Sequence, residues 1–298
     1  MRLDDYRESD NIGDQRGQSF GGGFGGGGLG GLALMIGSRF GIGGIIVVVI
    51  GMMLFGMNPL SLVGGGGGTQ QATQTQVGQQ TADRACAVDA ESRFSCQVLA
   101  STEDTWAKLF QAQGQRYADP GLIFYAGNGM SGCGAAQSAM GPFYCPSDNR
   151  IYLDTQFFQE LSQRFKAAGD FAQAYVIAHE VGHHVQYLTG VADQVRQAQS
   201  RASSAEGNAL QVRMELQADC YAGVWAAQNR DRLEPGDIEE GMRAAQAIGD
   251  DTLQRQAQGR VVPESFTHGT SAQRMAWLKR GLDSGDPAQC DTFAARTL

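Results

Sequence analysis

The chain has 298 residues and a formal net charge of −8, and 42 of its residues are glycine. Its basic residues form no cluster. Because nucleic-acid binding requires a basic patch that neutralises phosphates, we expect no nucleic-acid partner. Roughly the first eighty residues do not resemble globular sequence, so we expect one domain in the remaining length, which suffices for a sizeable core.

The N-terminal part is predicted to comprise a leader, a membrane segment and a linker. Residues 1–40 are polar and then glycine-rich, which predicts a disordered leader because such sequence buries little apolar surface. Residues 41–63 carry no charge and are long enough, at about 1.5 Å per residue, to span a bilayer as a helix. A buried core helix and a cleaved signal peptide are the alternatives. Residues 64–83 are predicted to be a flexible linker, and residues 84–298 the catalytic domain.

The positions of the arginines predict the orientation of the span. Arg2, Arg7, Arg16 and Arg39 precede it, and no lysine or arginine follows it before Arg84. The positive-inside rule then places the N-terminus in the cytoplasm and the main domain outside it, in the periplasm or another extracytoplasmic space. We therefore expect a single-pass membrane protein that contacts the lipid bilayer through one transmembrane helix.

The cysteines agree with an exported domain. All six follow the predicted span, and an even number of cysteines in an exported domain predicts disulfides. Many pairings are possible, and we favour two local loops and one long-range bond: Cys86–Cys96, Cys133–Cys145 and Cys220–Cys290.

The apolar pattern predicts an α+β domain, mostly helical with a small sheet. Strands are expected at 121–127 and in a hairpin of 143–145 and 151–154, with 132–141 as a candidate edge strand for substrate. Residues 191–208 are expected to be a helical excursion or a mobile loop. Helices are expected at 102–113, 157–168, 170–189, 209–228, 237–248 and 271–282.

The clearest chemical signal is the run His179-Glu-Val-Gly-His183. Residues four apart share one helical face, so His179 and His183 are predicted to be two ligands of one zinc ion. Glu180 adjoins His179, where its carboxylate can accept a proton from an activated water. Three of the four histidines fall in this segment, which favours a metal site over a chance match. His184 points away from the ligand face and is predicted not to be a ligand.

A catalytic zinc has three protein ligands and one open position. Glu215 and Asp219 are four residues apart in an apolar stretch, so they share a face of a second helix. Glu215 is predicted to complete a His-His-Glu site, and Asp219 to accept the free ring N–H of a ligating histidine. The alternative is a solvated acidic face.

The fourth histidine, His268, lies outside the motif. It is predicted to be a catalytic group that contacts the substrate carbonyl, with a structural cap of the helix near Ser271 as the alternative. Arg274 is predicted to be a structural ion-pair partner.

Together these strings resemble a known family. A His-Glu-x-x-His helix followed by Glu-x-x-x-Asp is similar to the gluzincin arrangement of thermolysin-type metallopeptidases. With the strings Gly141-Pro-Phe-Tyr-Cys-Pro, Glu215-Leu-Gln-Ala-Asp-Cys and Ser265-Phe-Thr-His-Gly-Thr-Ser-Ala-Gln-Arg, the chain resembles the bacterial neutral zinc metallopeptidase family of membrane-anchored proteins. This resemblance covers residues 103–293 and implies a zincin-like fold and a zinc peptidase, but no particular substrate.

We therefore expect a membrane-anchored zinc endopeptidase with one Zn²⁺ per chain, acting on a peptide or protein. His179, His183 and Glu215 are the expected metal ligands, and Glu180 the general base. A zinc hydrolase of non-peptide amides and a zinc-stabilised membrane scaffold without turnover are the alternatives. Glu180 argues against the scaffold, because a structural zinc site needs no base and closes its fourth position with a protein ligand.

Overall fold

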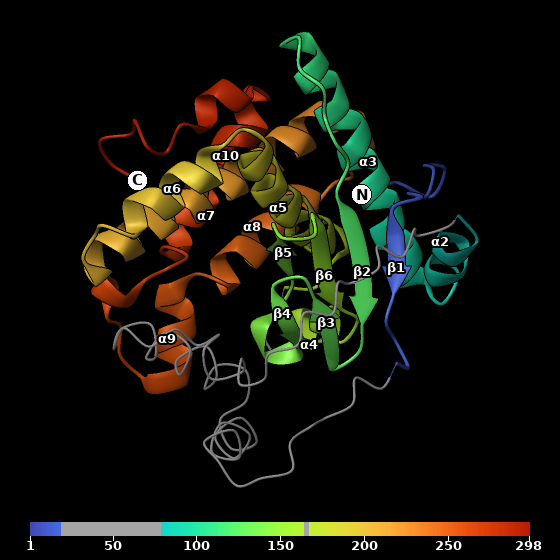
Figure 1. Cartoon of the computed structure of the whole chain (residues 1–298), viewed down its shortest axis with the longest axis horizontal. Helices are drawn as coiled ribbons and strands as arrows, with labels where there is room; N and C mark the ends of the chain where they lie inside the picture. Colours follow the sequence, from blue (N-terminus) through green and yellow to red (C-terminus); the bar gives the residue numbers. More distant parts are fainter. Residues whose placement is uncertain (19–78, 164–166) are drawn as a thin grey trace, which may run out of the picture.

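Figure 1 shows the computed structural model of the chain, which describes residues 1–18, 79–163 and 167–298. The predicted membrane segment 41–63 lies outside these residues, as do most of the predicted linker and residues 19–40 of the predicted leader. Among the helices of the described part, none combines the length and the apolar character that a membrane span requires.

The strands form two small sheets. The larger sheet has the order β1-β2-β6-β5, in which β1, β2 and β6 are parallel and β5 is antiparallel to β6. Its members are β1 (Ile12–Asp14), β2 (Gly121–Tyr125), β5 (Phe143–Cys145) and β6 (Arg150–Asp154). The predicted strand at 121–127 and the predicted hairpin are confirmed.

The candidate edge strand at 132–141 is placed differently. It supplies β4 (Gly134–Gln137), which pairs only with β3 (Asn128–Ser131) in a separate antiparallel hairpin. The strand that flanks β6 at this end of the larger sheet is β5, because the tight turn after Ser131 directs β4 back onto β3 instead of onto β6. The Cys133–Cys145 disulfide ties this hairpin to β5.

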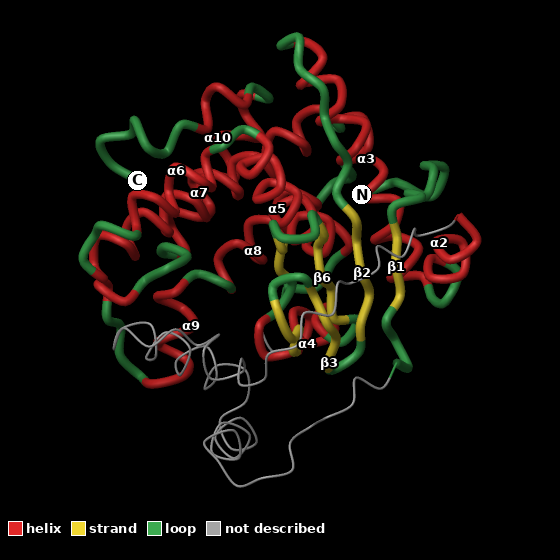
Figure 2. The backbone as a smooth tube through the Cα atoms, viewed as in Figure 1, coloured by secondary structure: helices red, strands yellow, loops and turns green. Residues whose placement is uncertain are grey.

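Helices make up most of the described chain and gather beside the strands (Figure 2). The expected mainly helical α+β class is confirmed. The helices are α2 (Gln79–Cys86), α3 (Ala90–Ala112), α4 (Phe157–Gln163), α5 (Asp170–Leu188), α6 (Val191–Gln199), α7 (Ser204–Gln228), α8 (Asp237–Ala247), α9 (Asp250–Gln258) and α10 (Ser271–Ser284). Short 3₁₀ turns lie at Ser138–Met140, Arg230–Arg232, Pro263–Ser265 and Pro287–Cys290.

Helix α7 lies between α5 and α10 and has extensive contacts with both. Its contact with α10 is made by backbone against backbone at two glycines. A Cβ atom at Gly223 would lie 2.1 Å from the carbonyl oxygen of Leu278, and one at Gly281 would lie 1.9 Å from that of Cys220. Any larger residue at either position would force the helices apart, so these glycines fix how closely α10 approaches the ligand helices.

The first eighteen residues, here called the N-terminal strap, are part of the domain. Residues 1–18 were expected to be disordered, and this expectation is wrong, because they contain strand β1 and the fully buried side chains of Leu3 and Ile12. The α-ammonium group of Met1 lies 2.7 Å from a carboxylate oxygen of Asp170 and 3.0 Å from one of Asp237. The polar composition of the strap predicted disorder, but its few apolar residues are buried in a core that the rest of the chain supplies.

All three favoured disulfides are present: Cys86–Cys96, Cys133–Cys145 and Cys220–Cys290. The third bond ties α7 to the C-terminal segment. It is buried, as is the first.

We predict that Gly281→Ala destabilises the domain by about 1–3 kcal/mol, because the added methyl group overpacks the contact between α7 and α10. The matched control is Gly207→Ala, in helix α7, where an added Cβ meets no atom within 4 Å. It should stabilise the domain by about 0.5–1 kcal/mol, since alanine is the better helix former. Denaturant unfolding measures both, and equal stabilities of the two variants would contradict this account of the contact.

Candidate metal centre

Two crossing helices carry the predicted ligands. Helix α5 presents His179, Glu180 and His183, and helix α7 presents Glu215. The helices approach closely because position 182 is glycine. A Cβ atom there would lie 3.0 Å from the Cα atom of Ala218 on α7.

The three predicted metal donors converge on one point. The Oε2 atom of Glu215 lies 3.2 Å from Nε2 of His179 and 3.5 Å from Nε2 of His183. Ligands at about 2.0–2.1 Å from a tetrahedral zinc ion lie about 3.4 Å apart, so these separations fit one ion. Two imidazoles and one carboxylate are also the donor types that zinc prefers in catalytic sites.

Hydrogen bonds fix the tautomer of both histidines. The Nδ1–H group of His179 donates to Oδ1 of Asp219 at 2.8 Å, and that of His183 donates to Oε1 of Gln186 at 2.9 Å. Each neutral ring then carries its lone pair on Nε2, directed at the common point. The amide of Gln186 is itself held by the carbonyl oxygen of Met214, to which its Nε2 donates at 2.7 Å.

Asp219 accepts hydrogen bonds on both of its carboxylate oxygens. Its fully buried carboxylate accepts bonds from the Tyr175 hydroxyl at 2.6 Å, from His179, and from Nε and Nη2 of Arg274, both at 2.9 Å. The structure places Asp219 behind His179, where the sequence predicted it. Arg274 is an ion-pair partner, also as predicted.

The charges of the centre shift its titration. Burial opposes the charged form of His183, but the carboxylates of Glu215 and Glu180 outweigh it and raise the pKa of His183 to about 9. The pKa of His179 is raised as well, because Asp219 and Glu215 outweigh the burial of its ring. Burial raises the pKa of Glu180 above its usual value, which makes this carboxylate a better proton acceptor.

His268 reaches the same cleft from the loop before α10. Its Nδ1 lies 3.3 Å from Oδ1 of Asp250, and its side chain is 42% exposed. The other carboxylate oxygen of Asp250 accepts backbone N–H groups of Thr267, His268 and Gly269, which fixes the loop. The helix cap is Thr270, whose side chain accepts from the backbone of Gln273, so the alternative role of His268 as a cap is wrong.

His184 is buried on the other side of α5. Its Nε2–H donates to the Ala118 carbonyl oxygen at 2.6 Å, so its Nδ1 accepts from the Tyr144 hydroxyl at 2.9 Å. Burial lowers the pKa of His184 to about 4, which keeps the ring neutral. It therefore anchors strand β5 beside the ligand helix and lies away from the metal donors.

A cleft of about 440 Å³ opens above the three donors. Glu180 and His268 line it together with the ligands, and strand β5 contributes Phe143 and Tyr144. Apolar side chains form much of its remaining wall: Met140, Pro142, Phe157, Val176, Met214 and Leu253. The predicted catalytic and ligand residues therefore share one cavity.

Three residues of the centre were missed by the sequence analysis. Gln186 is three residues after His183, and Tyr175 is four residues before His179, so helical spacing could have indicated both. Asp250 carries no such signal, because its role depends on a loop eighteen residues further along the chain.

A second acidic cluster occurs in the described part of the chain, formed by Asp170, Asp237 and Glu240. Two of its carboxylates bind the Met1 α-ammonium group, and Asp170 is exposed. The stronger candidate for a metal centre is therefore the group of His179, His183 and Glu215.

The whole chain matches a family model. The model, described as "Putative neutral zinc metallopeptidase", covers residues 1–293, so the chain belongs to this family, whose description implies zinc as the cofactor. The chain is 50% identical over 297 residues to uncharacterized protein YpfJ of Escherichia coli K12, covering 98% of this chain and 99% of that protein. It is 44% identical over 226 residues to uncharacterized protein Mb2605 of Mycobacterium bovis, covering 70% and 74% of the two chains. No solved structure matches it.

We predict that Glu215→Ala and Gln186→Leu both weaken zinc binding. Glu215→Ala removes a donor, and Gln186→Leu removes the acceptor that orients His183. Loss of such an outer partner costs about 10–100-fold in metal affinity, and loss of a ligand at least as much. Glu239→Ala, at an exposed position on α8, is the control. Titration against a competing chelator measures the affinities, and an unchanged affinity in Glu215→Ala would move the third ligand elsewhere.

We predict that zinc affinity rises with pH up to about 9. The raised pKa of His183 means that its imidazolium form dominates below that pH, and a metal must displace this proton. Each proton that zinc displaces gives about a tenfold gain in affinity per pH unit, so the affinity should rise at least tenfold per unit until His183 is neutral. Chelator competition from pH 6.5 to 9.5 tests this, and a flat profile between pH 7 and 8 would contradict it.

Proposed function

We propose that the protein is a zinc-dependent endopeptidase in which Glu180 is the general base. The observation that carries this proposal is the buried Glu180 carboxylate, which lines one cleft with the converging donors of His179, His183 and Glu215. A structural metal site would need neither a base nor an open cleft. One zinc ion per chain follows from the single donor set assigned above.

When bound, zinc acts as a Lewis acid that polarises the scissile carbonyl group and lowers the pKa of a water. Glu180 accepts the proton of the attacking water and then donates it to the leaving amine. The raised pKa of Glu180 helps the first transfer, because a carboxylate that holds a proton more tightly takes it more readily from water. Asp219 and Gln186 keep the histidine rings oriented throughout.

His268 is placed to stabilise the oxyanion that develops on the substrate carbonyl. Partial burial of the ring opposes its charged form, but the Asp250 carboxylate beside its Nδ1 outweighs this and raises the pKa of His268. In its protonated form the ring can donate a hydrogen bond into the cleft. Donors aimed at a developing charge lower the barrier because they need no reorganisation during the reaction.

The cleft favours a peptide over a small amide. Strand β5 is one of the two end strands of its sheet, and it lines the cleft with Phe143 and Tyr144. An extended peptide can add to such an edge through backbone hydrogen bonds. The apolar wall that includes Met140 and Phe157 fits large apolar side chains of the substrate. A zincin-like fold is part of this proposal.

The site of action is proposed from the sequence and the disulfides. Three disulfides involve all six cysteines, which favours an oxidising, extracytoplasmic compartment. The uncharged segment 41–63 is proposed to associate the protein with a lipid bilayer.

We predict that Glu180→Gln separates catalysis from metal binding. The amide keeps the shape of the side chain but cannot accept the proton, so cleavage of a peptide library should fall about 100–10,000-fold. The zinc content, measured by elemental analysis, should stay that of the unchanged protein. Glu239→Gln, which is exposed on α8, is the matched control and should keep full activity.

Two results would contradict this mechanism. Loss of zinc together with activity would make Glu180 a ligand or a structural group, and retained cleavage would assign the proton transfer to another residue. Hydrolysis of non-peptide amides without any cleavage of the library would favour the alternative substrate class.

A further inference from the structure

The N-terminal strap and the start of the main domain lie side by side. Strand β1 packs on helix α2, although the undescribed residues 19–78 separate the two in the sequence. The guanidinium group of Arg16 donates to the carbonyl oxygen of Ala85 at 2.9 Å and to the hydroxyl of Ser92 at 2.8 Å. The end of the strap therefore contacts the first helix that follows the undescribed residues.

The domain depends on the strap for the partners of a buried charge. The Glu103 side chain on α3 is only 4% exposed. Among the described residues, the groups that hydrogen-bond its carboxylate all come from the strap: Arg7 at 2.9 Å, Ser9 at 2.6 Å and Asn11 at 2.9 Å. Without the strap this carboxylate would be left without these partners, which is costly for a buried charge.

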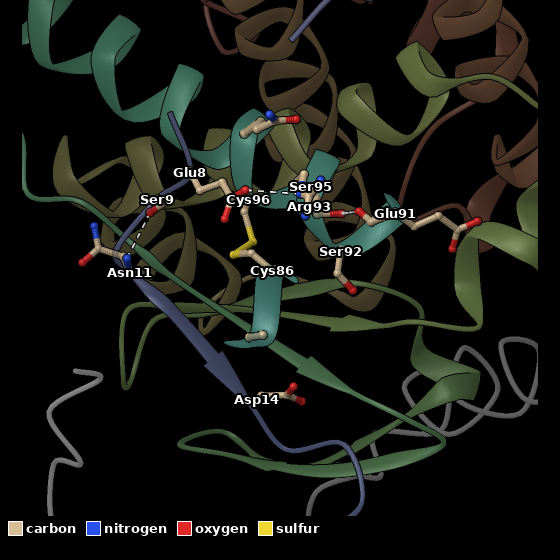
Figure 3. The surroundings of a disulfide bond; sticks show 12 residues. Glu8, Ser9, Asn11, Asp14, Cys86, Glu91, Ser92, Arg93, Ser95 and Cys96 are labelled. Atoms are coloured by element: carbon tan, nitrogen blue, oxygen red, sulfur yellow. Dashed lines mark hydrogen bonds and ion pairs between the residues drawn. A yellow bond between two sulfur atoms is a disulfide. The ribbon is translucent and has the colours of Figure 1, made fainter. Parts of the chain in front are cut away.

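The strap also lies directly on a disulfide. Figure 3 shows Ser9, Asn11 and Asp14 running past the Cys86–Cys96 bond. The backbone N–H of Ser9 donates to the carbonyl oxygen of Cys96 at 3.2 Å, and both cysteines are fully buried. The strap therefore contacts a part of the domain whose disulfide, Cys86–Cys96, forms in an oxidising compartment.

We propose that the N-terminal strap folds onto the domain in the compartment where the disulfides form, so that residues 18 and 79 lie on the same side of any membrane. One crossing by residues 41–63 would separate Arg16 from Ala85 by a hydrocarbon layer of about 30 Å, which no 2.9 Å hydrogen bond can bridge. This proposal replaces the cytoplasmic N-terminus that the arginine distribution predicted. It is independent of the proposed peptidase activity. It treats the strap as part of the domain, in agreement with the family model, which begins at residue 1.

The test compares the accessibility of two engineered thiols in the full-length protein. Asp10→Cys places a thiol at an exposed position of the strap, and Arg201→Cys places one at an exposed position of the main domain. All native cysteines are in disulfides, so each variant has one free thiol. Cells with an intact cytoplasmic membrane are treated with a membrane-impermeant maleimide, and lysed cells show the maximum labelling of each thiol.

Equal labelling of both thiols in intact cells is the expected result. Labelling of both thiols only after lysis would also support a common compartment. It would contradict the proposal that the domain is exported. Labelling of Arg201→Cys in intact cells and of Asp10→Cys only after lysis would overturn the proposal.

A second measurement tests docking of the strap in the purified full-length protein. Ile12→Asp puts a charge at a fully buried strap position, and Asp10→Ala is the exposed control two residues away. If the strap is docked, Ile12→Asp should lower the melting temperature by about 5–15 °C, while the control should not change it. Equal melting temperatures of Ile12→Asp and the unchanged protein would overturn the proposal, and the zinc content and peptidase activity of the control report separately on the proposed function.

Discussion

The bidentate ion pair between Arg274 and Asp219 is the interaction on which the centre depends. Asp219 is on α7 and Arg274 on α10, and the same carboxylate holds His179 on α5. One buried charge pair therefore joins three helices. Removing either partner would leave the other as an unpaired charge in the protein interior, which is strongly destabilising. This contact therefore orients His179, the first predicted ligand, and ties α10 to the two helices that carry the predicted ligands.

The charges around this contact indicate what kind of ion the centre holds. Three buried carboxylates, those of Glu180, Glu215 and Asp219, give a charge of −3, and Arg274 supplies +1. With both imidazoles neutral, the sum is −2. A dication balances it, and the donor types select zinc among dications. When no metal is bound, protons on His179 and His183 balance the negative charge of the carboxylates instead. The carboxylates therefore raise the pKa values of both histidines.

The local part of the centre could be predicted because helical spacing determines it. His179 and His183 share a face by their spacing, and the same rule places Asp219 near Glu215. Contacts between distant segments could not be predicted in this way. Asp250 holds the His268 loop, and the Glu103 carboxylate takes its partners from the strap, but neither relation leaves a pattern in neighbouring residues. The strap shows the limit most clearly, because its polar composition indicates disorder while its few apolar residues complete a core formed elsewhere.

The close crossing of α5 and α7 has a consequence for how the zinc motif tolerates substitution. The motif His-Glu-x-x-His leaves positions 181 and 182 open, but the two are not equivalent in this fold. Gly182 faces the Ala218 backbone, and a methyl group there would press the two helices apart at the level of the metal donors. A protein library randomised at positions 181 and 182 should therefore accept only apolar residues at the fully buried position 181 and return mainly glycine at 182. In this fold, the distance between the predicted metal donors of α5 and α7 depends partly on Gly182, a residue without a side chain.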